Sequence, residues 1–300
     1  MSVDPFYSLS FNSSLDNLTA QQDALTSELS SGLAVSSPSD DPLEASQGVA
    51  LGSAISREDA YVQSATSLEG MLQTSDSALG SVVTQITSAI SLATSGLNGT
   101  LSSSDLSEIG TQLGAIRDQV VSLANTEYAG SYLFSGTAGS TQPYTNDTST
   151  TPATATYAGD TNQQYTETPS GQKIAVSVPG SAIFSASGAD VLGSLNNLIA
   201  DFSTGTASAS TQADMNELSA GLSNLSAQRA VLDTSLSTLQ QTSSYASTEE
   251  TNLEAQQSTL VSANTATIAT QLSSTETQQQ ALMSVMSTIG SKSLFDYMQE

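Results

Sequence analysis

Hydrophobic residues recur at alternating steps of three and four near both ends of the chain. The N-terminal set comprises Phe11, Leu15, Leu18, Gln22, Leu25 and Leu29, and the C-terminal set comprises Leu218, Leu222, Leu225, Arg229, Leu232, Leu236 and Leu239. This spacing is an a/d heptad pattern, by which one helix lies along another. Chain termini are usually poorly ordered and dispensable, so apolar stripes at both ends indicate pairing with each other and with other copies of the molecule.

Turn-forming residues divide the N-terminal part of the chain into three predicted helices. The first covers residues 11–29, and Gly32 is placed to close its C-terminal end. The second is long and runs from Pro42 to Gly96, because proline suits a first helical position and the glycine-containing turn after it stops a helix. The third carries an unbroken apolar stripe and ends near Tyr128.

Two of these helices begin with the residues of a capping box, in which side chains at the N-cap and N3 positions bind each other's backbone N–H groups. Asp41 and Glu44 take these positions in the second helix, with Pro42 between them. Asp105 and Glu108 are predicted to take them in the third helix. A cation site at Asp41 is the alternative, but two adjacent carboxylates do not make a coordination shell, so we expect a helix start.

The chain changes character between Tyr132 and Ala186, where Thr, Ser, Gly, Pro and Tyr are frequent and the hydrophobic period falls to two. Residues 173–178 alternate like a half-buried strand, and residues 153–157 and 163–168 are weaker strand candidates. This segment therefore predicts a small β-rich insertion between helical arms. A short helix capped by Asp190 follows it.

Helix returns at about Thr211 and extends toward Ile289. The apolar stripe loses its register between Leu260 and Ile268, where steps of four repeat. Such a discontinuity changes the supercoil locally and indicates a break or a boundary between two bundle domains.

These elements predict a mainly α fold. We expect an elongated antiparallel helical bundle or coiled coil formed by the N- and C-terminal segments, with a small β-rich central insertion domain. The expected parts are an N-terminal assembly helix (1–40), the N-terminal arm of the bundle (41–131), a β-rich central domain with a short helix (132–210), the C-terminal arm (211–265) and a C-terminal assembly helix (266–300). Isolated amphipathic helices are marginal, so both assembly helices are expected to be disordered in the monomer.

Apolar residues of the two terminal helices are the predicted assembly interface. They are Leu15, Leu18, Leu25, Leu29, Leu272, Leu282, Met286, Ile289 and Leu294.

Composition removes most kinds of catalysis. The chain has no Cys, His or Trp, which excludes thiol nucleophiles, Ser-His-Asp triads and His/Cys zinc sites. An enzyme would need a pair of carboxylates in a cleft, and no pattern in the sequence nominates one. We therefore predict a non-enzyme with no cofactor and no metal.

Charge narrows the range of partners. With 29 acidic and 5 basic residues, the formal net charge is −24, which disfavours nucleic acid and anionic membrane surfaces. No apolar run approaches the roughly 18–20 residues that span a bilayer. The first residues lack the basic and apolar regions of a secretory signal, so we expect any export to use a route without a cleavable signal.

A series of short motifs resembles the flagellin superfamily, and its later members are more like the junction proteins of that superfamily than like filament flagellin. The motifs, in chain order, are Leu29-Ser30-Ser31-Gly32, Pro38-Ser39-Asp40-Asp41-Pro42, Asp76-Ser77-Ala78-Leu79, Asn98-Gly99-Thr100, Leu123-Ala124-Asn125-Thr126, Tyr132-Leu133-Phe134-Ser135-Gly136-Thr137, Pro143-Tyr144 and Ser293-Leu294-Phe295-Asp296-Tyr297-Met298. The likeness covers essentially the whole chain and is weakest in the middle.

The resemblance implies a structural protein that is exported unfolded through the flagellar type III apparatus and forms the junction between hook and filament. Its implied partners are other copies of itself in a ring, the hook-proximal junction protein, flagellin and an export chaperone, and its implied location is the extracellular flagellum.

Two alternatives remain open. A short filament flagellin would be present in thousands of copies per flagellum instead of a few. A secreted coiled-coil adhesin would carry a receptor-binding surface within residues 132–187 and would not need its terminal heptads for motility.

Overall fold

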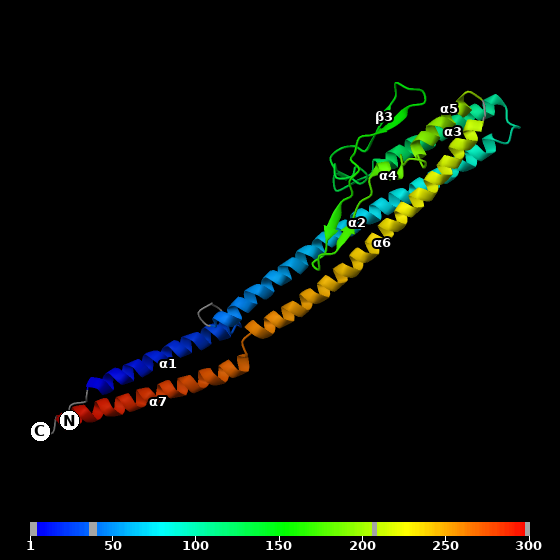
Figure 1. Cartoon of the computed structure of the whole chain (residues 1–300). Helices are drawn as coiled ribbons and strands as arrows, with labels where there is room; N and C mark the ends of the chain where they lie inside the picture. The colour runs from blue at the N-terminus through cyan, green and yellow to red at the C-terminus, as the bar shows by residue number, and fades with distance from the viewer. Residues whose placement is uncertain (1–4, 36–40, 206–208, 298–300) are drawn as a thin grey trace. The chain divides into compact units, whose positions relative to one another are not determined.

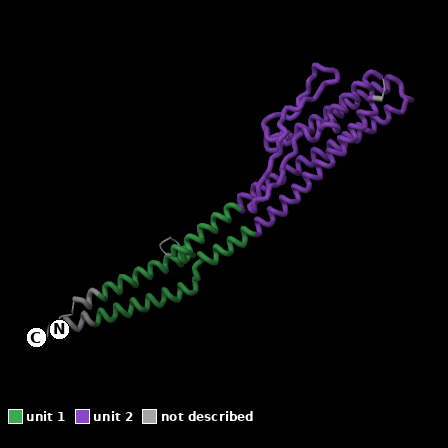
Figure 2. The backbone as a smooth tube through the Cα atoms, in the orientation of Figure 1, with its two compact units in different colours: residues 1–57, 249–300 green, residues 58–248 purple. Residues whose placement is uncertain are grey.

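The chain forms two compact units in the computed structural model, which describes residues 5–35, 41–205 and 209–297 (Figure 2). Unit 1 comprises residues 1–57 and 249–300, and unit 2 comprises residues 58–248. Two long helices, α2 (Pro42–Gly96) and α6 (Ala209–Val261), contribute to both units.

The remaining elements follow in chain order. Unit 1 contains α1 (Pro5–Ser31) and α7 (Thr265–Tyr297). Unit 2 contains α3 (Ser103–Ala124), β1 (Glu127–Tyr128), β2 (Ser131–Tyr132), β3 (Tyr144–Asp147), β4 (Thr154–Tyr157), β5 (Tyr165–Glu167), β6 (Lys173–Ala175), α4 (Gly180–Ile183) and α5 (Val191–Ser203) (Figure 1). Within the described ranges the strands pair as three antiparallel hairpins, β1–β2, β3–β4 and β5–β6. The predicted fold class is confirmed: a helical bundle of N- and C-terminal segments carries a small β-rich insertion.

The core of unit 2 repeats every seven residues along its helices. The fully buried positions of this repeat are Ala65, Leu72, Leu79, Ile86 and Ala93 on α2, and Leu218, Leu225, Leu232, Leu239 and Ala246 on α6. The heptad predicted from the C-terminal apolar stripe is therefore the buried face of α6. A seven-residue repeat sustained over several turns is the pattern of a left-handed supercoil.

Two polar pairs join α2 to α6 beside this core. The guanidinium of Arg229 binds the Asp76 carboxylate, with Nη2 and Oδ1 2.7 Å apart and both side chains 31% exposed. About two heptads further along, the hydroxyls of Tyr61 and Thr242 lie 2.6 Å apart. These pairs fix points along two otherwise repetitive helices.

The end of α2 fits closely against α5. Gly96 is the last residue of α2, and a Cβ added to it would lie 2.6 Å from the Phe202 ring. The sequence predicts that this glycine stops a helix, and the structure shows a second reason for it, because only hydrogen leaves room for the ring.

The insertion begins earlier than predicted. The third helix ends at Ala124, and the segment expected to complete it forms the β1–β2 hairpin instead. Ala129 (φ 50°) and Gly130 (φ 80°) both occupy the left-handed region, as the two central residues of a type I′ hairpin turn do. The predicted strands in 153–157, 163–168 and 173–178 are present as β4, β5 and β6, although β6 stops at Ala175, and β3 was not predicted.

Aromatic side chains and one buried arginine hold the insertion on the helices. The Phe184 ring meets those of Phe134 and Tyr144 edge to face, each at 5.7 Å between centroids. Arg117 lies on α3 and is only 7% exposed. Its Nη1 donates to the Ala153 carbonyl at 2.7 Å and to Asn196 Oδ1 on α5 at 3.2 Å, so one side chain links three segments.

Candidate assembly interface

The two terminal helices pack against each other in unit 1, with α1 running antiparallel to α7 (Figure 1). Among the side chains described for this pair, in residues 10–31 and 265–288, three are buried: Leu25 (7% exposed), Ile268 (4%) and Thr275 (4%). Two helices can bury only the narrow line along which they touch, so most of each apolar stripe stays partly in water.

The predicted interface residues fall into three classes. Leu25 is buried, Leu15, Leu18, Leu272 and Leu282 are half-buried, and Leu29 and Met286 are 39% and 42% exposed. Ile289 and Leu294 belong to α7, but their side chains lie outside the described residues. The structure thus brings the predicted residues onto one helix pair and leaves part of their surface available to a further partner.

Polar residues that an apolar pattern cannot find also lie between α1 and α7. The Thr275 hydroxyl donates to the Gln271 carbonyl one turn earlier, at 2.9 Å, which satisfies it without a partner from α1. Gln279 Nε2 donates to Thr19 Oγ1 at 3.4 Å across the pair. In the sequence, the only signal for Thr275 and Gln279 is their heptad position, three and seven residues after Leu272.

The C-terminal half of α7 exposes large apolar side chains, which we call the α7 face. They are Met283 (56% exposed), Val285 (46%) and Met286 (42%). In a helix of 3.6 residues per turn, Met283 and Val285 lie on opposite sides of the line through Leu282 and Met286. The apolar face of α7 is therefore wider than the contact with one helix can cover. Large apolar side chains exposed close together on one helix indicate an interaction site.

In unit 1, the segment that follows α1 lies beside the segment that follows α6. The loss of register between Leu260 and Ile268 coincides with an interruption of the C-terminal helix, since α6 ends at Val261 and α7 begins at Thr265. The Ala34 N–H donates to the Val261 carbonyl at 2.8 Å, and the Ala263 N–H donates to the Gly32 carbonyl at 2.9 Å. Gly32 has φ +72°, the left-handed conformation predicted for the residue that ends α1.

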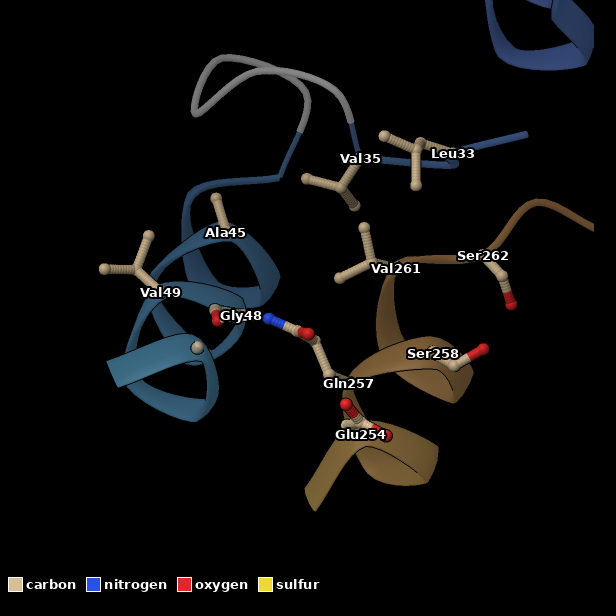
Figure 3. Close-up of a pocket in the computed structure, with 11 residues that line it drawn as sticks. Leu33, Val35, Ala45, Gly48, Val49, Glu254, Gln257, Ser258, Val261 and Ser262 are labelled. Atoms are coloured by element: carbon tan, nitrogen blue, oxygen red, sulfur yellow. Dashed lines mark hydrogen bonds between the residues drawn. The ribbon is translucent and has the colours of Figure 1, made fainter. Parts of the chain in front are cut away.

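A groove lies beside this linkage, between residues 33–35, the start of α2 and the end of α6. This linker groove has a volume of about 630 Å³ (Figure 3). The side chains of Val35 and Val261 point toward each other in it, and Gln257 reaches across to donate from Nε2 to the Gly48 carbonyl at 3.1 Å (Figure 3). Its lining is mostly aliphatic or glycine, with Glu254 as an acidic member.

Asp41 caps the helix that borders this groove. Its Oδ1 accepts from the Leu43 N–H at 2.8 Å and from the Glu44 N–H at 3.0 Å, so it satisfies two donors at the start of α2. Glu44 occupies the N3 position after Pro42.

The predicted cap of α3 is wrong by one turn. The N-cap is Ser102, and Asp105 occupies N3: the Ser102 hydroxyl accepts from the Asp105 N–H at 3.3 Å, and Asp105 Oδ2 accepts from the Ser102 N–H at 3.0 Å. Serine followed three residues later by an acid is itself a capping box. The Ser102 hydroxyl and the Ser102 N–H both donate to Asp105 Oδ2, and these two bonds lower the pKa of Asp105. Glu108 lies beyond the cap and accepts from Gln112 Nε2 at 3.2 Å.

A second capping acid lies at the start of α5, as predicted. Asp190 Oδ1 accepts from the Gly193 N–H at 2.8 Å, and the Asp190 N–H approaches Glu217 Oε1 on α6 at 3.5 Å. Burial raises the pKa of the Asp190 carboxyl, the Gly193 N–H lowers it, and the negative charge of Glu217 raises it again. Two carboxylates therefore meet where α5 begins.

Other kinds of site find little support in the part of the chain that the structure describes. Across residues 5–35, 41–205 and 209–297, no three Asp, Glu, His or Cys side chains gather as metal ligands would. Over those same ranges, no helix has the length and apolar character needed to cross a membrane.

Comparison with known proteins identifies proteins that resemble this chain. The model of the bacterial flagellin N-terminal helical region matches residues 6–139. The flagellar hook-associated protein 3 of Salmonella typhimurium is 32% identical over 173 residues, which are 57% of this chain and 53% of the relative. The protein of that name from Escherichia coli is 35% identical over 121 residues, or 40% of this chain and 38% of the relative. The matched regions thus span about half or less of these relatives.

A solved structure supports the fold independently. A putative flagellar hook-associated protein from Vibrio parahaemolyticus superposes with a TM-score of 0.64 at 23% identity, over 74% of this chain and 99% of its own. The N-terminal part of the chain thus matches the bacterial flagellin N-terminal helical region, and the chain is similar to flagellar hook-associated protein 3 over about half of its length.

Proposed function

We propose that this protein is a structural, non-enzymatic component of the bacterial flagellum that forms the junction between hook and filament. The observation that carries the proposal is the exposed apolar surface of unit 1, where α1 and α7 leave the α7 face in water. Exposed apolar surface of this kind indicates an interaction site. The net charge of −24 favours solubility of the free chain through self-repulsion, which allows such a surface to remain exposed before assembly. The names of its relatives support a hook-associated role.

The proposed partners follow from this role. They are other copies of the chain in a ring, the hook-proximal junction protein, filament flagellin and an export chaperone. The proposed location is the extracellular flagellum at the hook–filament junction, reached by export without a cleavable signal.

Deleting the gene tests this function. Cells without the chain are expected to make hooks that lack filaments and to release monomeric flagellin into the medium, as electron microscopy and analysis of the medium will show. Normal filaments in the deleted strain would contradict the proposal. A chain present in thousands of copies per flagellum would instead identify a filament flagellin.

The terminal segments 1–40 and 266–300 are proposed to be disordered in the free monomer and to become ordered on assembly. Limited proteolysis of the purified monomer is expected to remove both ends and to leave a resistant core near residues 41–265. Equal protection of the termini and the core would show that α1 and α7 are already stable as a pair.

A further inference from the structure

The turn between α2 and α3 contains an asparagine followed by a glycine. Residues 97–102 connect the two helices, and Asn98 and Gly99 lie in this segment with both residues exposed. No other asparagine in the sequence precedes a glycine. Gly99 has φ +64°, the left-handed conformation that glycine supplies in turns. The fold therefore places this pair outside any helix or strand and in contact with water.

The two groups that could react with each other are both free. Within the residues that the structure describes, neither the Asn98 carboxamide nor the Gly99 N–H has a hydrogen-bond partner. A Cβ added to Gly99 would meet nothing within 4 Å, so the space around this residue is open. No side chain on Gly99 hinders an approach of its backbone nitrogen to the Asn98 side chain.

We propose that Asn98 is a site of spontaneous deamidation, with the backbone nitrogen of Gly99 as the nucleophile. This nitrogen bonds to Asn98 Cγ and closes a succinimide ring, while the bond from Cγ to Nδ2 breaks. Nδ2 leaves as ammonia and takes up the proton that the Gly99 nitrogen loses. Water then opens the ring: addition at Cγ gives aspartate, and addition at the backbone carbonyl gives isoaspartate. The reaction needs water as its co-reactant and no enzyme.

The other asparagines are held more firmly. Those in helices are followed by an N–H group that is bonded to a carbonyl one turn earlier. Asn125 Oδ1 accepts from the Tyr144 N–H and its Nδ2 donates to the Tyr144 carbonyl, each at 2.8 Å. Asn146 lies in β3 and is paired with Ala155 of β4. The remaining asparagines outside helices precede residues whose side chains hinder ring closure, so Asn98 should react first.

The modification changes the end of α2 in two ways. The Leu97 N–H still donates to the Ala93 carbonyl at 3.1 Å, so Asn98 directly follows the last turn of this helix. A carboxylate there faces the negative end of the helix dipole, which is unfavourable. Isoaspartate also adds a carbon to the backbone that connects α2 to Ser102, the N-cap of α3.

Peptide mapping of the full chain tests the site. Trypsin cuts after Arg57, Arg117 and Lys173, so peptide 58–117 contains Asn98 as its only asparagine and peptide 118–173 contains three others. The folded chain is incubated at mildly alkaline pH and digested, and a sample digested at the start corrects for reaction during digestion. Mass spectrometry should show an amide replaced by a carboxyl in peptide 58–117 at least about tenfold faster than in peptide 118–173.

A matched variant and an unfolded sample complete the test. Isoaspartate, detected with an isoaspartyl methyltransferase, should accumulate in the parent chain and not in Asn98→Gln, whose longer side chain closes a ring far more slowly. Equal rates in the two peptides overturn the inference, as does reaction of Asn98 in urea but not in the folded chain. Aspartate formed without isoaspartate overturns the succinimide route. None of these results depends on the proposed junction function, which deletion of the gene tests separately.

Discussion

At the scale of single residues, aspartate carboxylates accept backbone N–H groups at the starts of three helices. Asp41, Asp105 and Asp190 each accept a backbone N–H in the first turn of a helix. All three were predicted as N-caps, and Asp41 and Asp190 take that role, but Asp105 lies at N3 because Ser102 is the N-cap of α3. Capping rules identify the residues that can act as an N-cap. Which of them does so depends on the backbone conformation, which the sequence rules do not give.

Removing the Asp41 cap is expected to destabilise the start of α2. Asp41→Ala should lower the free energy of unfolding by about 0.5–2 kcal/mol, because two backbone N–H groups lose their acceptor. Asp41→Asn is the control, since its side-chain oxygen can still accept. Thermal or urea unfolding measures both variants. A parent stability that rises sharply with Ca²⁺ would instead indicate an ion site.

The carboxylate pair at α5 predicts a pH dependence. Because the pKa of Asp190 is raised in the folded chain, the folded state binds this proton more tightly than the unfolded state does. The stabilisation from this proton is absent at pH 7 and grows as the pH falls through the folded pKa toward the ordinary value of about 3.9. At neutral pH the charged Asp190 carboxylate therefore stabilises the fold less than its protonated form would.

Glu217→Gln should relieve this effect, since an amide removes the repelling charge. We expect it to raise the free energy of unfolding by about 0.5 kcal/mol at pH 7, a magnitude typical of partly exposed charge pairs. The gain should shrink as the pH is lowered to 4, where Asp190 becomes protonated. Urea unfolding at both values is the measurement, and a gain that does not depend on pH would contradict the assignment.

At the scale of elements, periodicity predicts the helices well and the insertion only in part. The heptad stripe of α6 and the break near residue 262 follow from the spacing of apolar residues alone. β3 was not predicted because only Tyr144 in it is buried and the rest of the strand is exposed, so it has no alternation to detect. The apolar pattern does not detect Arg117 either, although it sits seven residues after Gly110 in the buried face of α3.

Arg117 is expected to hold the β3–β4 hairpin on the helices. Arg117→Met keeps much of the side-chain length but leaves the Ala153 carbonyl and the Asn196 amide without this donor. We expect a loss of about 1–3 kcal/mol in the free energy of unfolding and faster amide exchange in residues 145–154. Arg57→Met is the matched control, because Arg57 is exposed and the net charge changes equally. Unchanged exchange in the hairpin would contradict this role.

At the scale of the whole molecule, sequence indicates that the chain assembles, whereas structure indicates which surfaces are free to do so. The apolar stripes at residues 11–29 and 218–239 were expected to pair with each other, but the second is the buried face of α6, and α1 packs against α7 instead. The remaining exposure of Met286 depends on how far one helix extends along the other, which no sequence pattern gives. The linker groove depends on the non-helical segments at 32–35 and 262–264, and no periodicity predicts such segments.

Replacing Leu282 and Met286 together by Asp should separate assembly from folding. Leu282 is half-buried and Met286 is 42% exposed, so the melting temperature of the monomer should change little. Attachment of filaments should be lost, because each subunit would place two charges in an apolar contact. Calorimetry and microscopy measure the two effects, and secretion of the variant must be verified separately. Normal filaments with a secreted variant would contradict the role of α7.

The strict seven-residue repeat of unit 2 also creates an ambiguity of register. Sliding α6 along α2 by seven residues would restore one buried aliphatic side chain opposite another, so the core alone does not distinguish the two alignments. Any such slide separates Asp76 from Arg229, which is the only basic residue of α6. This ion pair and the Tyr61–Thr242 hydrogen bond thus select among alignments that are nearly equal in apolar burial, as a single polar residue does in designed coiled coils.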